Sequence, residues 1–286
     1  MQATSTPILD CNGRALDLSR TAIMGILNVT PDSFSDGGIF LTRDAAVTHA
    51  LAMVEAGADI IDVGGESTRP GAQAVSVQEE LDRVIPVIEA ITRAVPAPVS
   101  IDTSKPEVMR VAVAAGAGLI NDVRALRETG ALQTAAALEV PVCLMHMQGE
   151  PRSMQQNPAY TDVVGEVRDF LHERIEACAA AGIPRQRIIV DPGFGFGKTV
   201  EHNLELLRRL DELDVLGAPI LAGLSRKSMI GALFGLPVAQ RLHASVALAL
   251  IAVQNGATII RVHDVRATRE AIRMLEAVYP RMEEET

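Results

Sequence analysis

The feature that most constrains the fold is a two-part unit, an apolar β-branched stretch followed by an amphipathic or alanine-rich one, which recurs along nearly the whole chain. Eight such units succeed one another at a spacing of about 30 residues, the length of one strand–helix unit of a parallel sheet. Uninterrupted apolar stretches are typical of strands that are buried on both faces. The predicted strands are 22–29, 59–65, 98–102, 118–123, 140–147, a strand that begins at 188, 219–225 and 259–264.

Helical stretches separate the predicted strands and never give way to a run of consecutive strands. This alternation predicts an α/β fold, a (β/α)8 TIM barrel, with residues 1–286 in a single domain and the barrel over residues 21–280. The alternative is an open, doubly wound sheet. Asn12-Gly13 is a turn signal and predicts a short N-terminal β-hairpin within residues 1–20. The predicted helices are 44–57, 77–94, one that starts near Pro106, 131–138, 163–181, 200–213, 227–233, 241–255 and 267–278.

Composition narrows the possible functions. The chain has 286 residues, 48% of them hydrophobic, which suffices for one large α/β barrel domain or two smaller domains. The net charge of -10 argues against a general nucleic-acid-binding or anionic-membrane surface. Cys11, Cys143 and Cys178 have no paired spacing, which favours reduced thiols in a cytoplasmic protein. The first ten residues do not resemble a signal peptide, and no apolar run reaches the roughly 20 residues of a membrane span.

The stretch IIVDPGFGFGKT, residues 188–199, indicates where a ligand binds. It starts as a buried strand and ends in Asp191, and a carboxylate in such a position needs a partner. The glycines after Asp191 allow the backbone to approach a ligand closely. Ligands bind at the carboxyl ends of the strands in a parallel barrel. We therefore expect Asp191 to belong to the floor of a pocket.

Polar side chains stand at the end of every predicted strand, and a barrel places all of these ends on one rim. A rim this rich in polar groups indicates an enzyme or a specific binding protein. The residues are Asn28, Glu66, Thr68, Arg69, Asp102, Asn121, Asp122, His146, Asp191, Ser225, Arg226, Lys227, Arg261, His263 and Asp264.

Two subsets of these residues differ in chemistry. Asp102, Asn121 and Asp191 are acceptors on neighbouring strands and suit a flat heterocycle whose edge carries several N–H donors. The second subset is cationic and suits a phosphate or pyrophosphate. Together they indicate a nitrogen-rich ring attached to a phosphorylated group, although any single residue could instead be a helix cap or half of an ion pair. The cationic residues are Arg69, Arg226, Lys227, Arg261 and His263.

Other patterns carry alternatives. The connections 30–40 and 67–75 are rich in turn formers and are predicted to act as lids, with Phe34 either lining a substrate slot or pinning its own loop. PGFGFGKT resembles a phosphate-binding loop, but Pro192 replaces its first glycine, which argues against Lys198 as a nucleotide lysine. His146 and His263 lack the third ligand that a zinc site needs. A Schiff base at Lys227 is disfavoured by the adjacent Arg226.

Two long stretches, MGILNVTPDSFSDGG (24–38) and GGESTRPGA (64–72), resemble the signature sequences of the dihydropteroate synthase family. The resemblance continues in order through SIDTSKP, LINDV, MHMQG, DPGFGFGKT, GLSRKS and RVHDV, so it covers nearly the whole predicted barrel. It implies a transferase of folate synthesis that joins 4-aminobenzoate to (7,8-dihydropterin-6-yl)methyl diphosphate and releases pyrophosphate. It also implies Mg²⁺ as the cofactor and a homodimer.

The resemblance also implies a role for each matching residue. Asp102, Arg69 and Lys227 would be catalytic, and Asn28 would contact Mg²⁺. A related barrel, the pterin-dependent methyltransferase, is the alternative; it would share the acceptors but need no diphosphate clamp. A non-catalytic pterin carrier is a second alternative. The substrate-binding residues implied are Asp102, Asn121, Asp191 and Lys227 around the pterin, Met145, Phe196 and Arg261 against its faces, Arg69, Arg261 and His263 at the diphosphate, and Thr68, Ser225 and Phe34 at the aminobenzoate.

Overall fold

The computed structural model describes residues 8–29, 39–67, 75–150 and 153–280 of the chain. Eight parallel strands form one sheet in the order β8-β7-β6-β5-β4-β3-β10-β9, and a bridge between Val190 and Ile220 joins its two edges. The sheet is therefore closed, which confirms the predicted barrel and excludes the open doubly wound sheet. The strands are β3 (Ala22–Asn28), β4 (Ile60–Gly64), β5 (Val99–Asp102), β6 (Leu119–Asp122), β7 (Val142–Met145), β8 (Ile188–Asp191), β9 (Leu221–Ala222) and β10 (Ile259–Val262).

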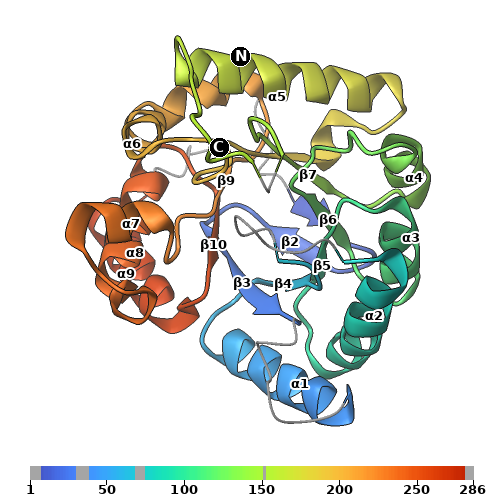
Figure 1. The fold of residues 1–286 in the computed structure, drawn as a ribbon. Helices are drawn as coiled ribbons and strands as arrows, with labels where there is room; N and C mark the ends of the chain where they lie inside the picture. The colour runs from blue at the N-terminus through green and yellow to red at the C-terminus, as the bar shows by residue number, and fades with distance from the viewer. Residues whose placement is uncertain (1–7, 30–38, 68–74, 151–152, 281–286) are drawn as a thin grey trace, which may run out of the picture.

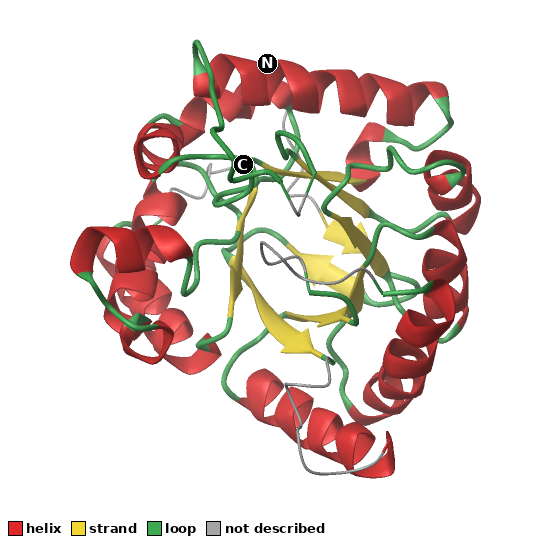
Figure 2. Ribbon diagram, in the orientation of Figure 1, coloured by secondary structure: helices red, strands yellow, loops and turns green. Residues whose placement is uncertain are grey.

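Helices surround the barrel as an outer ring (Figures 1 and 2). The stretch predicted as one helix, 200–213, differs: α6 ends at Arg208, Arg209 leaves helical geometry, and a tighter 3-10 helix follows over Leu210–Leu216. None of the described helices is long and apolar enough to cross a membrane. The helices are α1 (Ile39–Glu55), α2 (Val77–Ala94), α3 (Pro106–Ala114), α4 (Ala131–Leu138), α5 (Val163–Ala180), α6 (Val200–Arg208), α7 (Ser228–Phe234), α8 (Leu242–Gln254) and α9 (Val265–Val278).

An antiparallel hairpin fills the amino-terminal end of the barrel. Its strands are β1 (Ile8–Asp10) and β2 (Ala15–Asp17), and Asn12 and Gly13 both have positive φ at the turn, as predicted. The hairpin packs so closely that a Cβ on Gly118 would lie 2.2 Å from the carbonyl oxygen of Cys11. Leu9 and Leu16 contribute to an apolar cluster inside the barrel. This end of the barrel is therefore a packed core.

The interior of the barrel is layered, because successive residues of a strand point to opposite faces. The lower inward layer is largely apolar and includes Ile60, Leu119, Ile189 and Ile259. Two residues further along β4, β6, β8 and β10 the inward positions are polar, whereas β3 carries Ile26 there. The side chains that reach the carboxyl-terminal mouth are thus set by the strand period alone.

Candidate active site

The upper inward layer lines a cavity at the carboxyl ends of the strands. Asp102, Asn121, Asp191 and Arg261 reach it from β5, β6, β8 and β10. The predicted acceptors therefore meet, although Asp191 is not on a strand adjacent to Asn121, since β7 lies between β6 and β8. The cavity is lined by Asp102, Asn121, Val123, Met145, Asp191, Phe194, Phe196, Gly223, Lys227 and Arg261.

Arg261 forms the charged centre of the mouth. Its Nε lies 2.6 Å from Asp62 Oδ2, and its Nη2 lies 2.8 Å from Asp102 Oδ2. Burial would lower the pKa of Arg261, but the negative charges of Asp62 and Asp102 outweigh burial and raise it. The guanidinium is therefore fixed by two carboxylates and stays charged at every pH at which the protein is folded.

Asp62 was missed by the sequence analysis. Its side chain is 0% exposed, and Oδ2 accepts a hydrogen bond from Asn121 Nδ2 (3.2 Å) in addition to that from Arg261. An acid in the middle of the apolar stretch 59–65 is the signal that could have revealed it, because a charge within a buried strand needs a partner.

Burial perturbs the two carboxylates of the cavity. It raises the pKa of Asp102 to about 7, with Arg261 opposing the rise and Asp62 adding to it. It also raises the pKa of Asp191, against a hydrogen bond from Gly193 N (2.7 Å) and the nearby cations. Carboxylates whose charged form is destabilised by burial gain the most stabilisation when a ligand supplies N–H donors.

Lys227 also lines the cavity. It directly precedes α7, and its Nζ lies 4.2 Å from the centre of the Phe196 ring, a cation–π contact. Burial lowers the pKa of Lys227 to about 8, with Asp191 opposing that effect. The two cations of the cavity, Lys227 and Arg261, thus lie among the acceptors and not in a separate phosphate-binding cluster.

The turn after β8 is held by a buried lysine. Lys198, only 3% exposed, donates to the carbonyl oxygens of Gly193 (3.0 Å) and Phe196 (3.1 Å), and its Nζ lies 2.9 Å from His146 Nδ1. Lys198 therefore organises its own loop. Gly193 is required for steric reasons: its φ is +69°, and a Cβ there would lie 1.9 Å from the carbonyl oxygen of His146.

His146 is a neutral acceptor in this turn. Burial lowers the pKa of Lys198 to about 7, and in its ammonium form Lys198 can only donate, so the ring nitrogen that faces it then carries no proton. Burial, together with the charge of Lys198, lowers the pKa of His146 to about 2. The ring also packs edge-on against Phe170, with 5.0 Å between the ring centroids. The role of His146 is therefore structural, since its partners are Lys198 and Phe170.

Ser225 and His263 lie side by side at the ends of β9 and β10, with 3.0 Å between Ser225 Oγ and His263 Nδ1. Neither is among the residues that line the cavity. The sequence predicts Arg226 to be a phosphate-binding cation. In the structure, however, its Nε and its Nη2 both pair with the carboxylate of Asp264, at 2.9 Å and 2.5 Å. That guanidinium is engaged within the protein.

Asn28 ends β3 on the same rim. A Cβ on Gly64 would lie 3.8 Å from Asn28 Oδ1 and 3.7 Å from Asp102 Oδ2, so the two side chains flank Gly64. Within the described part of the chain, no group of three or more His, Cys, Asp or Glu side chains could hold a metal ion. An amide oxygen does suit Mg²⁺, which commonly takes one or two protein ligands together with phosphate oxygens and water. Asn28 therefore fits a metal that the substrate helps to hold.

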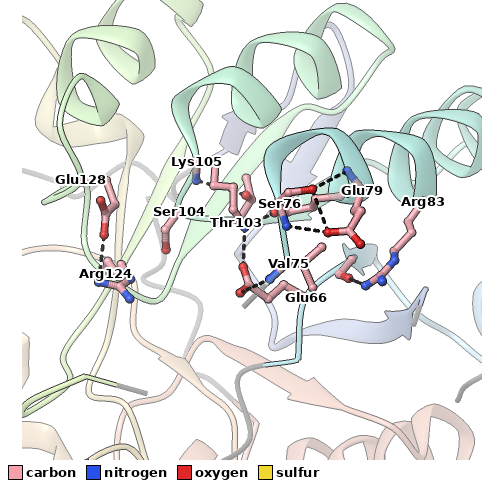
Figure 3. A network of polar contacts seen from close by, with 12 residues as sticks. Glu66, Val75, Ser76, Glu79, Arg83, Thr103, Ser104, Lys105, Arg124 and Glu128 are labelled. Atoms are coloured by element: carbon pink, nitrogen blue, oxygen red, sulfur yellow. Dashed lines mark hydrogen bonds and ion pairs between the residues drawn. The ribbon is translucent and has the colours of Figure 1, made fainter. Parts of the chain in front are cut away.

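Three predicted site residues, Phe34, Thr68 and Arg69, lie outside the described residues. Figure 3 shows the polar network formed by described residues on either side of positions 68–74, the connection that contains Thr68 and Arg69. Glu66 Oε1 accepts from the backbone N–H of Val75 (3.2 Å), and Lys105 Nζ lies 2.5 Å from both Glu66 Oε2 and Glu80 Oε2. The two described ends of the connection, at Glu66 and at Val75, are thereby joined to each other and to α2.

This combination of a closed parallel barrel with a buried acceptor floor defines the class of pterin-binding enzymes, and residues 24–263 match the family described as pterin binding enzyme. The chain is 56% identical to the dihydropteroate synthase of Escherichia coli (strain K12) over 269 residues, 94% of this chain and 95% of that one. The chain belongs to the dihydropteroate synthase family.

Solved structures agree with this assignment. The Xanthomonas albilineans dihydropteroate synthase with 4-aminobenzoic acid is 56% identical, with a TM-score of 0.92 over 97% of this chain and 100% of that one. The same enzyme in complex with 7,8-dihydropteroate is matched with a TM-score of 0.88 at 54% identity, over 96% of this chain and 100% of that one.

Proposed function

We propose that this chain condenses (7,8-dihydropterin-6-yl)methyl diphosphate with 4-aminobenzoate, giving 7,8-dihydropteroate and pyrophosphate in folate biosynthesis. The observation that carries the proposal is the meeting of Asp102, Asn121 and Asp191 with Lys227 and Arg261 in one cavity. Relatives that share more than half of their sequence with this chain are dihydropteroate synthases, and one of them has been solved with 4-aminobenzoic acid and with 7,8-dihydropteroate.

The pterin ring would bind edge-on to the acceptors. Asp102, Asn121 and Asp191 accept from its ring N–H and amino groups, while Lys227 donates to its acceptor atoms. Met145 and Phe196 supply apolar contact. Arg261 lies over the ring, where a planar guanidinium stacks well. Both charged forms, the carboxylates and the ammonium, are needed for this pairing.

The reaction begins with cleavage of the C–O bond between the pterin methylene group and the diphosphate. The electron pair leaves with the diphosphate, and positive charge spreads from the methylene carbon into the ring. Asp102 and Asp191 provide fixed negative charge beside that ring, so the cation is stabilised without reorganisation of solvent. The arylamine nitrogen then attacks the carbon, forms the C–N bond and releases its proton. A covalent enzyme intermediate is not required.

The remaining roles follow the family resemblance. Arg69 and His263 would bind the diphosphate, and Thr68, Ser225 and Phe34 would form the aminobenzoate slot. Asn28 would hold Mg²⁺, which when bound supplies charge neutralisation for the leaving group.

The assembly and the compartment are also part of the proposal. Exposed apolar side chains on α7, α8 and α9, among them Phe234, Ile251 and Met274, support a homodimer that buries this face. The three cysteines are free and buried, which supports a reducing cytoplasm. We also propose that residues 1–286 act as one domain.

A pyrophosphate-release assay tests the function. The pterin diphosphate is supplied with and without 4-aminobenzoate and Mg²⁺, and release should depend on both. A pterin methyltransferase would release no pyrophosphate, and its melting temperature would not respond to the diphosphate group. A non-catalytic pterin carrier would bind the ring without turnover. Absence of aminobenzoate-dependent release would refute the proposal.

A further inference from the structure

Asp62 lies behind the cavity wall and has no place in the proposed binding of either substrate. It occupies the inward position of β4 between the apolar lower layer and the mouth, and its side chain is fully buried. A buried carboxylate is destabilised by its loss of hydration unless its partners are well placed. The partners of Asp62 therefore indicate its purpose.

The first partner is Asn121, whose Nδ2 donates to Asp62 Oδ2 at 3.2 Å. An ionised carboxylate can only accept, so it selects the amino side of the Asn121 carboxamide. The opposite orientation would place the amide oxygen against the carboxylate. Asp62 thus fixes which end of Asn121, a residue of the cavity lining, is left for a ligand: the amide oxygen and one remaining N–H.

The second partner is Arg261, which donates from Nε to the same oxygen of Asp62 at 2.6 Å and from Nη2 to Asp102 at 2.8 Å. Contacts at two different nitrogens define the plane of a guanidinium, because rotation about its stem would break one of them. The other oxygen, Asp62 Oδ1, has no hydrogen-bond partner among the described residues. A single oxygen therefore orients both neighbours.

We propose that Asp62 is a positioning residue that determines which hydrogen-bonding groups Asn121 presents to the pterin ring and that holds the guanidinium of Arg261 in the plane in which it stacks over that ring. This inference rests on the proposed function, since it assigns a specificity role within the same site. Asp62 itself touches neither substrate. Its removal should therefore weaken recognition of the ring and leave the aminobenzoate slot intact.

Two variants test the proposal. Asp62→Leu removes the acceptor, so Asn121 is free to turn over and Arg261 loses one of its two anchors. The KM for the pterin diphosphate should rise on the order of 10-fold or more, the effect of one buried hydrogen bond, while the KM for 4-aminobenzoate stays at the wild-type value. Asp62→Asn should raise the pterin KM several-fold, because a neutral carboxamide can turn either atom toward Asn121.

Asp59→Leu is the matched control. Asp59 immediately precedes the same strand and pairs with Arg20 and Arg269 at the opposite end of the barrel. This variant should lose stability but keep both KM values. A merely structural role for Asp62 predicts that the Asp62 and Asp59 variants behave alike.

Calorimetric binding of 6-hydroxymethylpterin provides a second readout that needs no turnover. Its affinity should fall in both Asp62 variants and remain unchanged in the Asp59 variant. Wild-type pterin affinity in either folded Asp62 variant would overturn the proposal. A wild-type protein that binds the pterin but releases no pyrophosphate would refute the proposed function and leave the role of Asp62 testable by binding alone.

Discussion

The ammonium group of Lys227 lies 4.2 Å from the centre of the Phe196 ring, although the two residues follow different strands, β9 and β8. The contact holds a cation at the cavity wall without neutralising it, because the aromatic face offers partial negative charge and no proton acceptor. Lys227 therefore remains available to a ligand, and its pKa of about 8 places its loss of charge close to physiological pH.

The affinity for the pterin should fall at acidic pH and again at alkaline pH, which gives its pH profile an acid limb and an alkaline limb. Below a pH of about 7, Asp102 takes up a proton and can no longer accept two hydrogen bonds. Above a pH of about 8, Lys227 loses its proton and its charge. We expect the affinity for 6-hydroxymethylpterin, measured by calorimetry, to be highest between these values and to fall on both sides.

Lys227→Arg is the control for the alkaline limb, because a guanidinium stays charged throughout the range. A limb that persists in this variant belongs to titration of the ligand or of Lys198, whose pKa burial lowers to about 7. A profile that is flat in the wild-type protein would contradict the assignment of both groups.

Asp102→Asn should separate activity from stability. Loss of a preorganised charge beside the developing cation should reduce kcat on the order of 10²-fold or more. The folded pKa of Asp102, about 7, lies above the ordinary value of 3.8 for this carboxyl group, so the folded state binds more protons between these values and stability falls as pH rises through them. A neutral asparagine avoids that loss, and the melting temperature at neutral pH should be unchanged or higher. Near-wild-type turnover in a folded Asp102→Asn protein would exclude the electrostatic role.

The strand and helix pattern was largely predictable because it follows from local periodicity. The helix predicted over 131–138 is observed over Ala131–Leu138, and five of the polar residues at the strand ends line one cavity, namely Asp102, Asn121, Asp191, Lys227 and Arg261. Both results need only the two-residue period of a strand and the closure of the barrel.

The partners of these residues were not predictable in the same way. Asp62 contacts Asn121 and Arg261 at sequence separations of 59 and 199 residues, which depend on the register between strands. Arg226 was grouped with the phosphate-binding cations because the sequence does not reveal its pairing with Asp264. The type of residue suggests a role, but only the fold decides which group each charged side chain pairs with.

Lys105→Met should destabilise the protein more than its partial exposure suggests. The substitution leaves the carboxylate of Glu80, which is 0% exposed, without its cation. Breaking a buried pair from one side typically costs about 3–5 kcal/mol. Chemical denaturation should show a loss at the lower end of this range, because Lys105 also reaches solvent.

A double variant tests whether the stranded charge is the cause. Lys105→Met combined with Glu80→Met removes both charges and should recover much of the lost stability. Glu66→Gln, which leaves the pair of Lys105 with Glu80 in place, should cost less than Lys105→Met. Additive losses in the double variant would mean that Lys105 and Glu80 do not act as a pair.

Lys198→Met should destabilise the turn that carries Asp191 and Phe196. Methionine matches the length of lysine but leaves the carbonyl oxygen of Phe196 and the ring nitrogen of His146 without the lysine donor, while the carbonyl oxygen of Gly193 keeps the backbone N–H of Phe196 at 3.1 Å. Each buried acceptor left unpaired costs about 1–3 kcal/mol, and removal of the buried lysine offsets part of this cost. We therefore expect the free energy of unfolding to fall by about 2 kcal/mol or more.

The same variant should also weaken pterin binding, because the turn places the Phe196 ring against Lys227. Denaturant unfolding gives the loss of stability, and calorimetry with 6-hydroxymethylpterin gives the loss of affinity. Arg168→Met, at an exposed ion pair on α5, should change both quantities little. If Lys198→Met unfolds at the wild-type denaturant concentration, the buried ammonium does not hold the turn, and the arrangement of Phe196 must depend on the glycines alone.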